Sequence, residues 1–281
     1  MNVNLNKVKK GASLNGDGRI STENSEPFFK GSLVEIFILS YAPYSFSEKH
    51  ALKHELMPFF SETRLGKIGR WLLNPQDSSL SEKHISALEQ SAAAELAICA
   101  AMKNSGRPFA PSDYAYKESG QPTIQNGYIS ISHTEGYAAC AIAREPVGID
   151  VERGHTFSKA AAKRILSPQE ELMSDSTNAD ELLSRIWTVK ESFLKMTGEG
   201  IPGGMRTLEL IAAGDGSSGK WIIKRGTKPE AGCAVLLSIS GSGNSADFND
   251  AYLSVCTKKK AMMHINRFES VESILEFLNE P

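Results

Sequence analysis

The stretch ADELLSRIWTVKESFLKMT, residues 179–197, has the strongest structural pattern in the chain. On a helical period of about 3.6 residues, its apolar side chains form one continuous face: Leu182, Leu183, Ile186, Trp187, Phe193 and Leu194. Lys190 falls inside this apolar face, Glu191 lies at its edge, and Lys195 follows one turn later. A lysine in an apolar face either extends its amine to solvent or meets an anionic partner. The helix is therefore either an ordinary amphipathic element or one wall of a site.

A second unusual stretch is the short strand VGIDVE, residues 147–152. Side chains two positions apart share a face of a strand, so Asp150 and Glu152 point the same way while Ile149 and Val151 pack inward. Two carboxylates on one face repel each other unless a cation lies between them, and oxygen ligands suit Mg²⁺. The alternative is a strand with a solvated acidic face.

A third feature is the pair Ser132-His133 in the stretch SISHTEG, at the corner of an expected hairpin. There a hydroxyl, an imidazole and backbone N–H groups could face an anion, although a histidine in a turn is commonly just a surface residue. Taken together, the carboxylate pair, the helix with Glu191 between two lysines, and this corner indicate a metal-assisted phosphoryl or pyrophosphate site.

The composition is that of an ordinary globular protein, with 281 residues, 41% hydrophobic and 23% charged. A formal net charge of −2 argues against a dedicated nucleic-acid binder. No apolar run is long enough to span a membrane, and the first residues lack the apolar region of a secretory signal. The cysteines are far apart in apolar runs, which is typical of buried thiols in a reducing compartment. We expect a cytoplasmic monomer with no membrane or nucleic-acid partner.

The order of the elements favours an α+β fold. We expect a disordered or loosely attached tail over residues 1–28, an N-terminal subdomain over 29–146, and a C-terminal subdomain over 147–281 that carries the motifs. The first subdomain should contain a strand over 32–41, a helix over 81–103 and a hairpin over 128–143. The second should contain helices over 158–165 and 179–197, strands near 205–212, 220–225, 232–239 and 251–256, and a final helix over 270–279.

Through these motifs the chain resembles the 4′-phosphopantetheinyl transferases of the longer, Sfp-like type. The stretches that carry the resemblance are GIDVE, residues 148–152, and WTVKESFLK, residues 187–195, with Ser132-His133 before the first and KRILSP, residues 163–168, between them. The resemblance extends over about residues 120–201. It implies two similar α+β halves around a pseudo-twofold axis, with coenzyme A between them.

The resemblance also implies an activity. Such enzymes transfer the phosphopantetheine arm of coenzyme A to a serine of an apo acyl or peptidyl carrier protein, and release adenosine 3′,5′-bisphosphate. By resemblance, Asp150, Glu152 and Glu191 hold Mg²⁺, for which Mn²⁺ could substitute. Glu191, Lys195 and Asp150 are the catalytic residues. Coenzyme A contacts Ser132, His133, Lys190 and Lys195. The carrier could be of the fatty-acid, polyketide or peptide-synthetase type.

Two positions depart from the pattern. Gln121 stands where family members often have lysine, and Gln90 occupies the region of the 81–103 helix that often carries an arginine. Both departures put the affinity for coenzyme A in doubt more than catalysis. Two alternatives therefore remain: a non-catalytic homologue that binds coenzyme A and metal, and a Mg²⁺-dependent pyrophosphohydrolase that uses water in place of the carrier serine.

Overall fold

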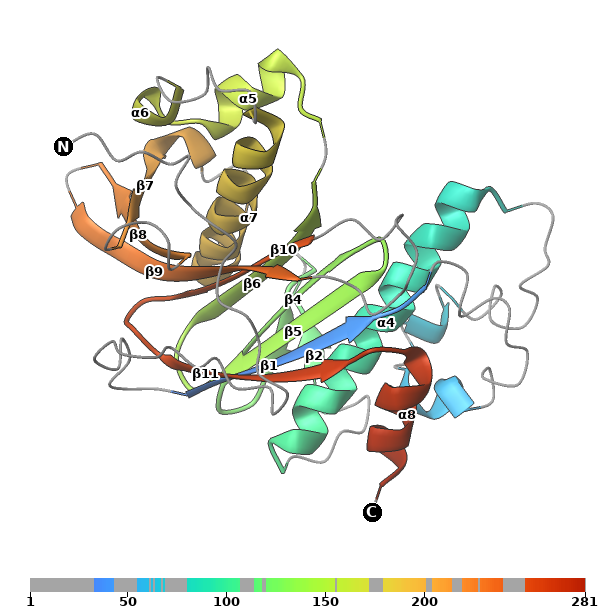
Figure 1. The fold of residues 1–281 in the computed structure, drawn as a ribbon. Helices are drawn as coiled ribbons and strands as arrows, with labels where there is room; N and C mark the ends of the chain where they lie inside the picture. Colours follow the sequence, from blue (N-terminus) through green and yellow to red (C-terminus); the bar gives the residue numbers. More distant parts are fainter. Residues whose placement is uncertain are drawn as a thin grey trace.

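Two β-sheets pack against each other, and one long helix covers the outer face of each sheet (Figure 1). The computed structural model describes residues 33–42, 55–60, 62, 64–66, 68, 80–106, 114–117, 120–154, 156–171, 179–200, 204–213, 219–226, 228–239 and 251–280. The predicted tail over residues 1–28 lies outside these ranges. None of the described helices has the length and apolar character needed to cross a membrane.

The first sheet is the one nearer the C-terminal helix in Figure 1. Its strand order is β11 (Met262–Phe268), β1 (Leu33–Ser40), β5 (Tyr137–Ala143) and β4 (Tyr128–Thr134). Helix α4 (Glu82–Asn104) packs on its outer face together with α8 (Val271–Asn279) and the 3₁₀ turn η2 (Met57–Phe59). A separate two-stranded sheet joins β2 (Tyr114–Tyr116) and β3 (Pro122–Ile124).

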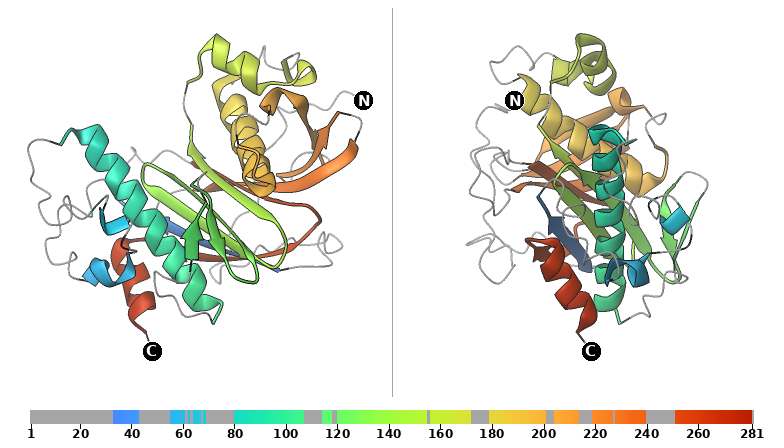
Figure 2. Two further views of the ribbon diagram at one scale, coloured as in Figure 1. Left: turned by 180° about the vertical axis from the view of Figure 1, so that it is seen from behind. Right: turned by 90° about the vertical axis from the view of Figure 1, so that its right-hand side faces the viewer.

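The second sheet has the strand order β6 (Val147–Arg153), β10 (Ala251–Thr257), β9 (Lys228–Ile239), β8 (Lys220–Arg225) and β7 (Leu208–Ala212). Helix α7 (Ala179–Thr197) packs on its outer face. Two short helices, α5 (Lys159–Ile165) and α6 (Pro168–Glu171), and the 3₁₀ turn η4 (Met205–Thr207) lie near it (Figure 1). Seen from behind, α4 and α7 lie on opposite sides of the paired sheets (Figure 2).

The two halves repeat one order of elements. In the first half β1 is followed by α4 and then by the hairpin β4–β5, whose second strand pairs antiparallel with β1. In the second half β6 is followed by α7 and by the hairpin β9–β10, whose second strand pairs antiparallel with β6. The predicted α+β fold of two similar halves is confirmed.

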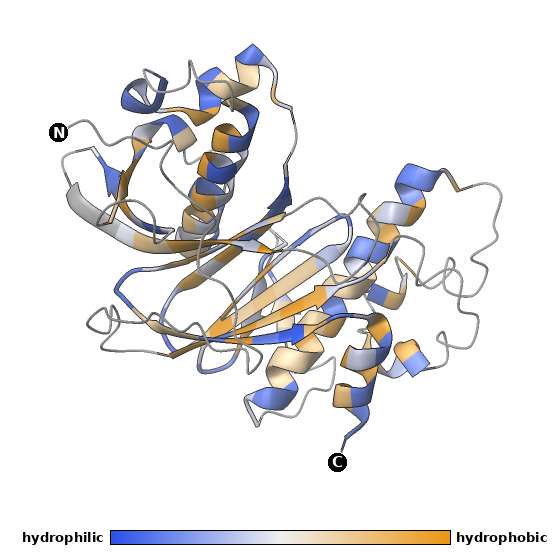
Figure 3. Ribbon diagram, in the orientation of Figure 1, coloured by the Kyte–Doolittle hydropathy of each residue, from blue (hydrophilic) through white to orange (hydrophobic). Residues whose placement is uncertain are grey.

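Alternation along the strands separates two apolar layers. Val34, Ile36 and Ile38 of β1 belong to the core between the sheets, together with Ile149 and Val151 of β6. The opposite face of the first sheet meets α4, where alanines on both surfaces let the helix approach the strands closely. Figure 3 shows the apolar colours concentrated on the central strands. The inward direction predicted for Ile149 and Val151 is thus confirmed.

The end of the chain packs with the first half. Strand β11 pairs in parallel with β1, from Leu33 opposite Met262 to Leu39 opposite Phe268. Helix α8, capped by Ser270, packs on α4 and completes the core beneath that sheet. The described residues 262–279 therefore lie with the first sheet and not with the second, although they fall inside the predicted C-terminal subdomain over 147–281. The other predicted boundaries stay predictions.

Gly148 is where β6 and α7 come closest. A Cβ atom built on Gly148 would overlap the backbone carbonyl oxygen of Ser192 and lie 2.5 Å from the backbone nitrogen of Met196. Neither atom belongs to a flexible side chain, so neither can move aside without moving the helix. The absence of a side chain at this position therefore sets the spacing between strand and helix.

Lys190 is fully buried, and its amine is paired inside the protein. Its Nζ atom donates to Glu170 Oε2 at 2.6 Å and to the carbonyl of Ile165 at 2.8 Å. Glu170 also accepts from the backbone nitrogens of Ser167 and Leu210, so one carboxylate joins α6, α7 and β7. This pairing contradicts the prediction that Lys190 contacts coenzyme A, and also the alternative that it extends to solvent, because the amine is enclosed and its charge is already neutralised.

The first prediction concerns Gly148. We expect Gly148→Ala to lower the free energy of unfolding by about 3 kcal/mol or more, the upper end for overpacking, because two backbones must separate. Gly154→Ala is the matched control, since a Cβ there meets nothing within 4 Å. Urea unfolding of the two variants measures the difference. Equal stability of both variants would show that the close approach is not a constraint.

The second prediction concerns Lys190. We expect Lys190→Met to lower the free energy of unfolding by about 3–5 kcal/mol, because Glu170 is left buried without a cation. The double variant Lys190→Met/Glu170→Gln should regain most of this loss, and coenzyme A affinity should stay unchanged in the folded protein. Denaturant titration and calorimetry provide both readouts. A stable Lys190→Met variant with weakened coenzyme A binding would restore the phosphate-binding role.

Candidate active site

Two rows of side chains face each other between β6 and α7. The strand presents every second residue and the helix every fourth, and the two rows are Gly148, Asp150 and Glu152 on β6 and Lys195, Glu191 and Trp187 on α7. Contacts at Asp150–Lys195 and at Glu152–Trp187 show that strand and helix run in opposite directions. The apolar face of α7 packs on the second sheet, so this row lies at the edge of the packed face.

Asp150 lies at the centre of the site and is buried. Its Oδ1 atom accepts from Lys195 Nζ at 2.7 Å and from Ser132 Oγ at 2.8 Å, and Lys195 also donates to Ser132 at 2.8 Å. Its Oδ2 atom is buried and has no hydrogen-bond partner. Because an unpaired buried carboxylate oxygen is costly, this atom has capacity for a further cation or donor.

Two more carboxylates lie beside Asp150. Burial, followed by the charge of Asp150, raises the pKa of Glu191 to about 7, against the opposing effect of Lys195. Burial and the same aspartate raise the pKa of Glu152 to about 7, although a hydrogen bond from Trp187 Nε1 at 3.4 Å lowers it. Glu191 Oε1 is buried without a partner. Of the three carboxylates, only that of Asp150 contacts Lys195 directly in the described part of the chain, and the charge of Lys195 acts on the other two from a greater distance.

These residues do not form a closed metal cage by themselves. Within the described part of the chain, no group of three or more histidine, cysteine, aspartate or glutamate side chains converges closely enough to hold a metal ion. The excess negative charge and the two unpartnered oxygens nonetheless fit a divalent cation. Mg²⁺ commonly takes only one or two protein carboxylates and completes its shell with water and phosphate oxygens.

Ser132 and His133 leave β4 toward opposite sides. Ser132 faces Asp150, as described, and its neighbour two residues earlier, Ser130, accepts a hydrogen bond from the backbone nitrogen of Ile149. The two serines thereby connect the edge of the first sheet to β6. His133 is exposed, and its Nδ1 atom lies 3.1 Å from Gln90 Oε1.

Arg64 brings a second cation toward this edge. It precedes α4 in the chain. Its guanidinium donates to Glu95 Oε2 at 3.1 Å and to the Tyr116 hydroxyl at 3.1 Å. Desolvation, followed by the positive charges of Lys195 and Arg64, lowers the pKa of His133. Arg64 therefore adds positive charge near His133 from outside the 81–103 helix, while it is itself paired with Glu95.

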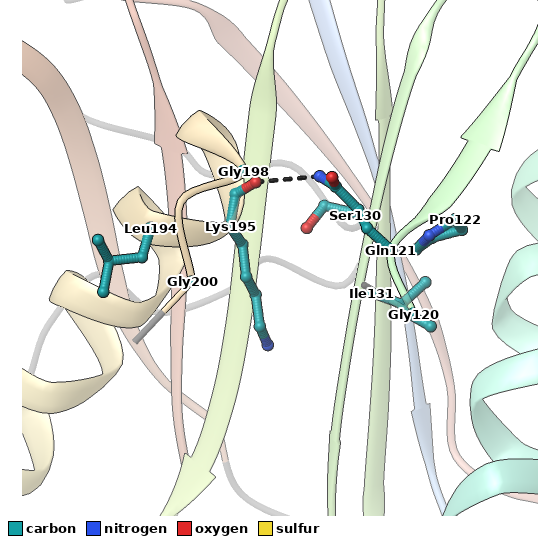
Figure 4. A pocket seen from close by; sticks show the side chains of 9 residues that line it. All are labelled: Gly120, Gln121, Pro122, Ser130, Ile131, Leu194, Lys195, Gly198 and Gly200. Carbon is teal, nitrogen blue, oxygen red and sulfur yellow. Dashed lines mark hydrogen bonds between the residues drawn. The ribbon is translucent and has the colours of Figure 1, made fainter. Parts of the chain in front are cut away.

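A cavity of about 210 Å³ opens beside Lys195. The turn at Gly120, Gln121 and Pro122 forms one wall, and the end of α7 forms the other (Figure 4). Gln121 Nε2 donates to the backbone carbonyl of Lys195 at 3.2 Å, and Gln121 Oε1 accepts from Lys117 Nζ at 3.0 Å. Gln121 thus links the two halves through its amide.

The structure brings together most of the residues singled out in the sequence. Asp150, Glu152, Glu191, Lys195 and Ser132 meet at one place, and His133 lies beside them, whereas Lys190 points away into the core. The sequence reasoning missed Ser130, Arg64 and the polar role of Trp187. Strand alternation could have found Ser130, which shares a face with Ser132. No local pattern marked Arg64.

Comparisons with known proteins agree with this geometry. Residues 146–255, from the start of β6 to β10, match the model of the 4′-phosphopantetheinyl transferase superfamily. The 4′-phosphopantetheinyl transferase psf-1 of Bacillus pumilus is 28% identical over 167 residues, which cover 57% of this chain and 66% of the relative. The 4′-phosphopantetheinyl transferase Sfp of Bacillus subtilis is 32% identical over 94 residues, 31% of this chain and 42% of the relative.

A solved structure also overlaps in part. The Thermotoga maritima holo-[acyl-carrier-protein] synthase aligns with a TM-score of 0.30 and 23% identity over 41% of this chain and 64% of that chain, too slight an overlap to bear on the fold. The chain spans less than two thirds of the length of the two curated relatives. The family match and both curated relatives agree: over the region that holds Asp150, Glu152, Glu191 and Lys195, this chain is similar to the 4′-phosphopantetheinyl transferase superfamily and resembles its Sfp-like members.

Proposed function

We propose that this protein transfers the 4′-phosphopantetheine arm of coenzyme A to a serine of an apo carrier protein and releases adenosine 3′,5′-bisphosphate. The observation that carries the proposal is the Asp150–Lys195 pair with Glu152 and Glu191 beside Asp150, in which two buried carboxylate oxygens are left unpartnered. A divalent cation bound to a pyrophosphate would offset the excess negative charge of these carboxylates. The family match over residues 146–255 supports the same chemistry.

The metal proposed for this site is Mg²⁺, with Mn²⁺ as a substitute. Asp150, Glu152 and Glu191 would hold it, and the unpartnered Asp150 Oδ2 and Glu191 Oε1 are the oxygens that fit it best. When bound, the ion would neutralise charge on the pyrophosphate and on the carboxylates. Pyrophosphate oxygens would complete a shell that the described protein residues do not complete by themselves.

Glu191 is the proposed general base. Its ionised carboxylate, next to Asp150, would accept a proton from the carrier serine. The serine oxygen then bonds to the phosphorus of the phosphopantetheine group, and the bond from that phosphorus to the bridging oxygen breaks. Lys195, which already donates to Asp150 and Ser132, would donate to the departing phosphate.

Ser132, His133 and the cations near them would contact the nucleotide end of coenzyme A. Ser132 and His133 lie on the β4 side of Lys195, and Arg64 adds positive charge near His133. At the cavity wall Lys117 contacts Gln121, so a cation lies next to the amide where the family often has lysine. These groups lessen the doubt that Gln121 and Gln90 raised about coenzyme A affinity.

A third prediction tests the transfer directly. The protein is incubated with Mg²⁺, coenzyme A and apo carriers of the fatty-acid, polyketide and peptide-synthetase types, and each carrier is weighed by mass spectrometry. Wild type should add one phosphopantetheine group, whereas Asp150→Ala should lose most of the activity. Glu191→Gln should lower kcat by about 10²-fold or more, the usual scale for a lost acid–base group, with little change in KM.

The matched control is Glu181→Gln, on the same helix. Glu181 is exposed and pairs with Arg185 at 3.6 Å, away from the carboxylate cluster, so its loss should leave turnover unchanged. Normal turnover by Asp150→Ala, or by wild type in excess chelator, would reject the metal assignment. Coenzyme A binding without transfer would favour the non-catalytic homologue, and phosphopantetheine release without carrier would favour the pyrophosphohydrolase.

A fourth prediction concerns pH. Folding raises the pKa of Glu152 and of Glu191 from 4.5 to about 7, so their protonated forms favour the folded state. Their contribution to the free energy of unfolding is fully present below about pH 4.5 and is lost as pH rises through about 7. Without metal, thermal stability should therefore fall over this window, and less steeply in Glu152→Gln/Glu191→Gln. Added Mg²⁺ should raise Tm more at pH 8 than at pH 5, and an equal rise would contradict the assignment.

A further inference from the structure

Trp187 is the residue of the α7 row that the proposed reaction does not use. It precedes Glu191 by one helical turn and is half-buried. An indole at the edge of a packed helix face would ordinarily serve only as apolar surface, which is how its place in the helical pattern was interpreted. Its nitrogen, however, is directed at a carboxylate of the site.

The indole N–H group donates to Glu152 Oε1 over 3.4 Å, a long hydrogen bond. It engages one oxygen of that carboxylate and leaves the other for a different partner. Glu152 lies at the end of the β6 row, where its raised pKa reflects burial and the charge of Asp150. A fixed neutral donor at this position restrains the carboxylate without cancelling its negative charge.

The indole itself is held in place. The ring of Phe157, which follows β6 along the chain, packs against Trp187 at a centroid separation of 6.0 Å and a tilt of 46°. The tryptophan thus bridges the strand that carries Glu152 and the helix that carries Glu191. Hydrogen-bond partners behind a carboxylate ligand commonly fix its orientation and raise its affinity for metal.

We propose that Trp187 is a positioning residue that orients Glu152 toward the divalent cation through its indole N–H. The inference rests on the proposed function only in assigning Glu152 to the metal. It predicts a change in cation affinity, which can be measured without carrier protein and without turnover.

The fifth prediction is a Mn²⁺-binding experiment on the full chain in the presence of coenzyme A. Free Mn²⁺ is measured by electron paramagnetic resonance. Trp187→Phe keeps an aromatic ring but lacks the N–H group, and should weaken Mn²⁺ affinity by about 10-fold, the lower end for an outer-shell partner. Mn²⁺ should also quench part of the tryptophan emission of wild type, and this quenching should diminish in the variant.

Two controls separate the hydrogen bond from packing. Phe157→Leu alters the ring against which the indole packs but retains the N–H group, and Trp221→Phe removes an indole from the buried core beside α7, away from the carboxylates. Trp221→Phe should keep wild-type affinity, and Phe157→Leu should lose clearly less affinity than Trp187→Phe. In a Glu152→Gln background, Trp187→Phe should cause no further loss, because the two residues act through one another.

Three results would overturn the inference: a Trp187→Phe variant with wild-type affinity, an equal loss in Phe157→Leu, or a wild type that binds no Mn²⁺ with coenzyme A. Far-ultraviolet circular dichroism confirms that each variant is folded. A wild type that binds Mn²⁺ with the predicted variant pattern but modifies no carrier would reject the transferase proposal and leave the role of Trp187 intact.

Discussion

The close approach of β6 to α7 at Gly148 is the constraint on which the site depends. Because no Cβ atom intervenes, the strand lies directly against the helix backbone at Ser192 and Met196. From this contact the two rows of side chains extend together, so that Asp150 meets Lys195 and Glu152 meets Trp187. A wider separation would leave three carboxylates without the lysine that balances part of their charge.

The two lysines of α7 show how position decides the role of a charge. Lys190 lies inside the protein, where burial lowers its pKa and Glu170 opposes that effect, and its bonds fix the helix against α6 and the end of α5. Lys195 remains partly exposed and is shared between Asp150 and Ser132, beside an open cavity. One lysine holds the helix in place, and the other is available to an anionic ligand.

The sequence was most informative where the determining interactions are local. Periodicity predicted α7 and the alternation of Asp150 with Ile149 and Val151, because both patterns follow from backbone geometry alone. It could not identify the partner of Lys190, since Glu170 lies 20 residues earlier and reaches it only through tertiary packing. Arg64 was missed for the same reason. The resemblance supplied roles for the site residues, but the contacts of Gln121 required the structure.

The pairing of β1 with β11 has a consequence for how this chain is made. Glu35 on β1 bonds to His264 on β11 across a sequence separation of 229 residues. The first sheet therefore cannot acquire its last strand until nearly all of the described chain has left the ribosome, whereas α7 and β6 can already meet. Such non-local pairing slows folding. The half of the protein that is synthesised first is the half completed last, so an unpaired edge of β1 is the segment that needs protection during synthesis.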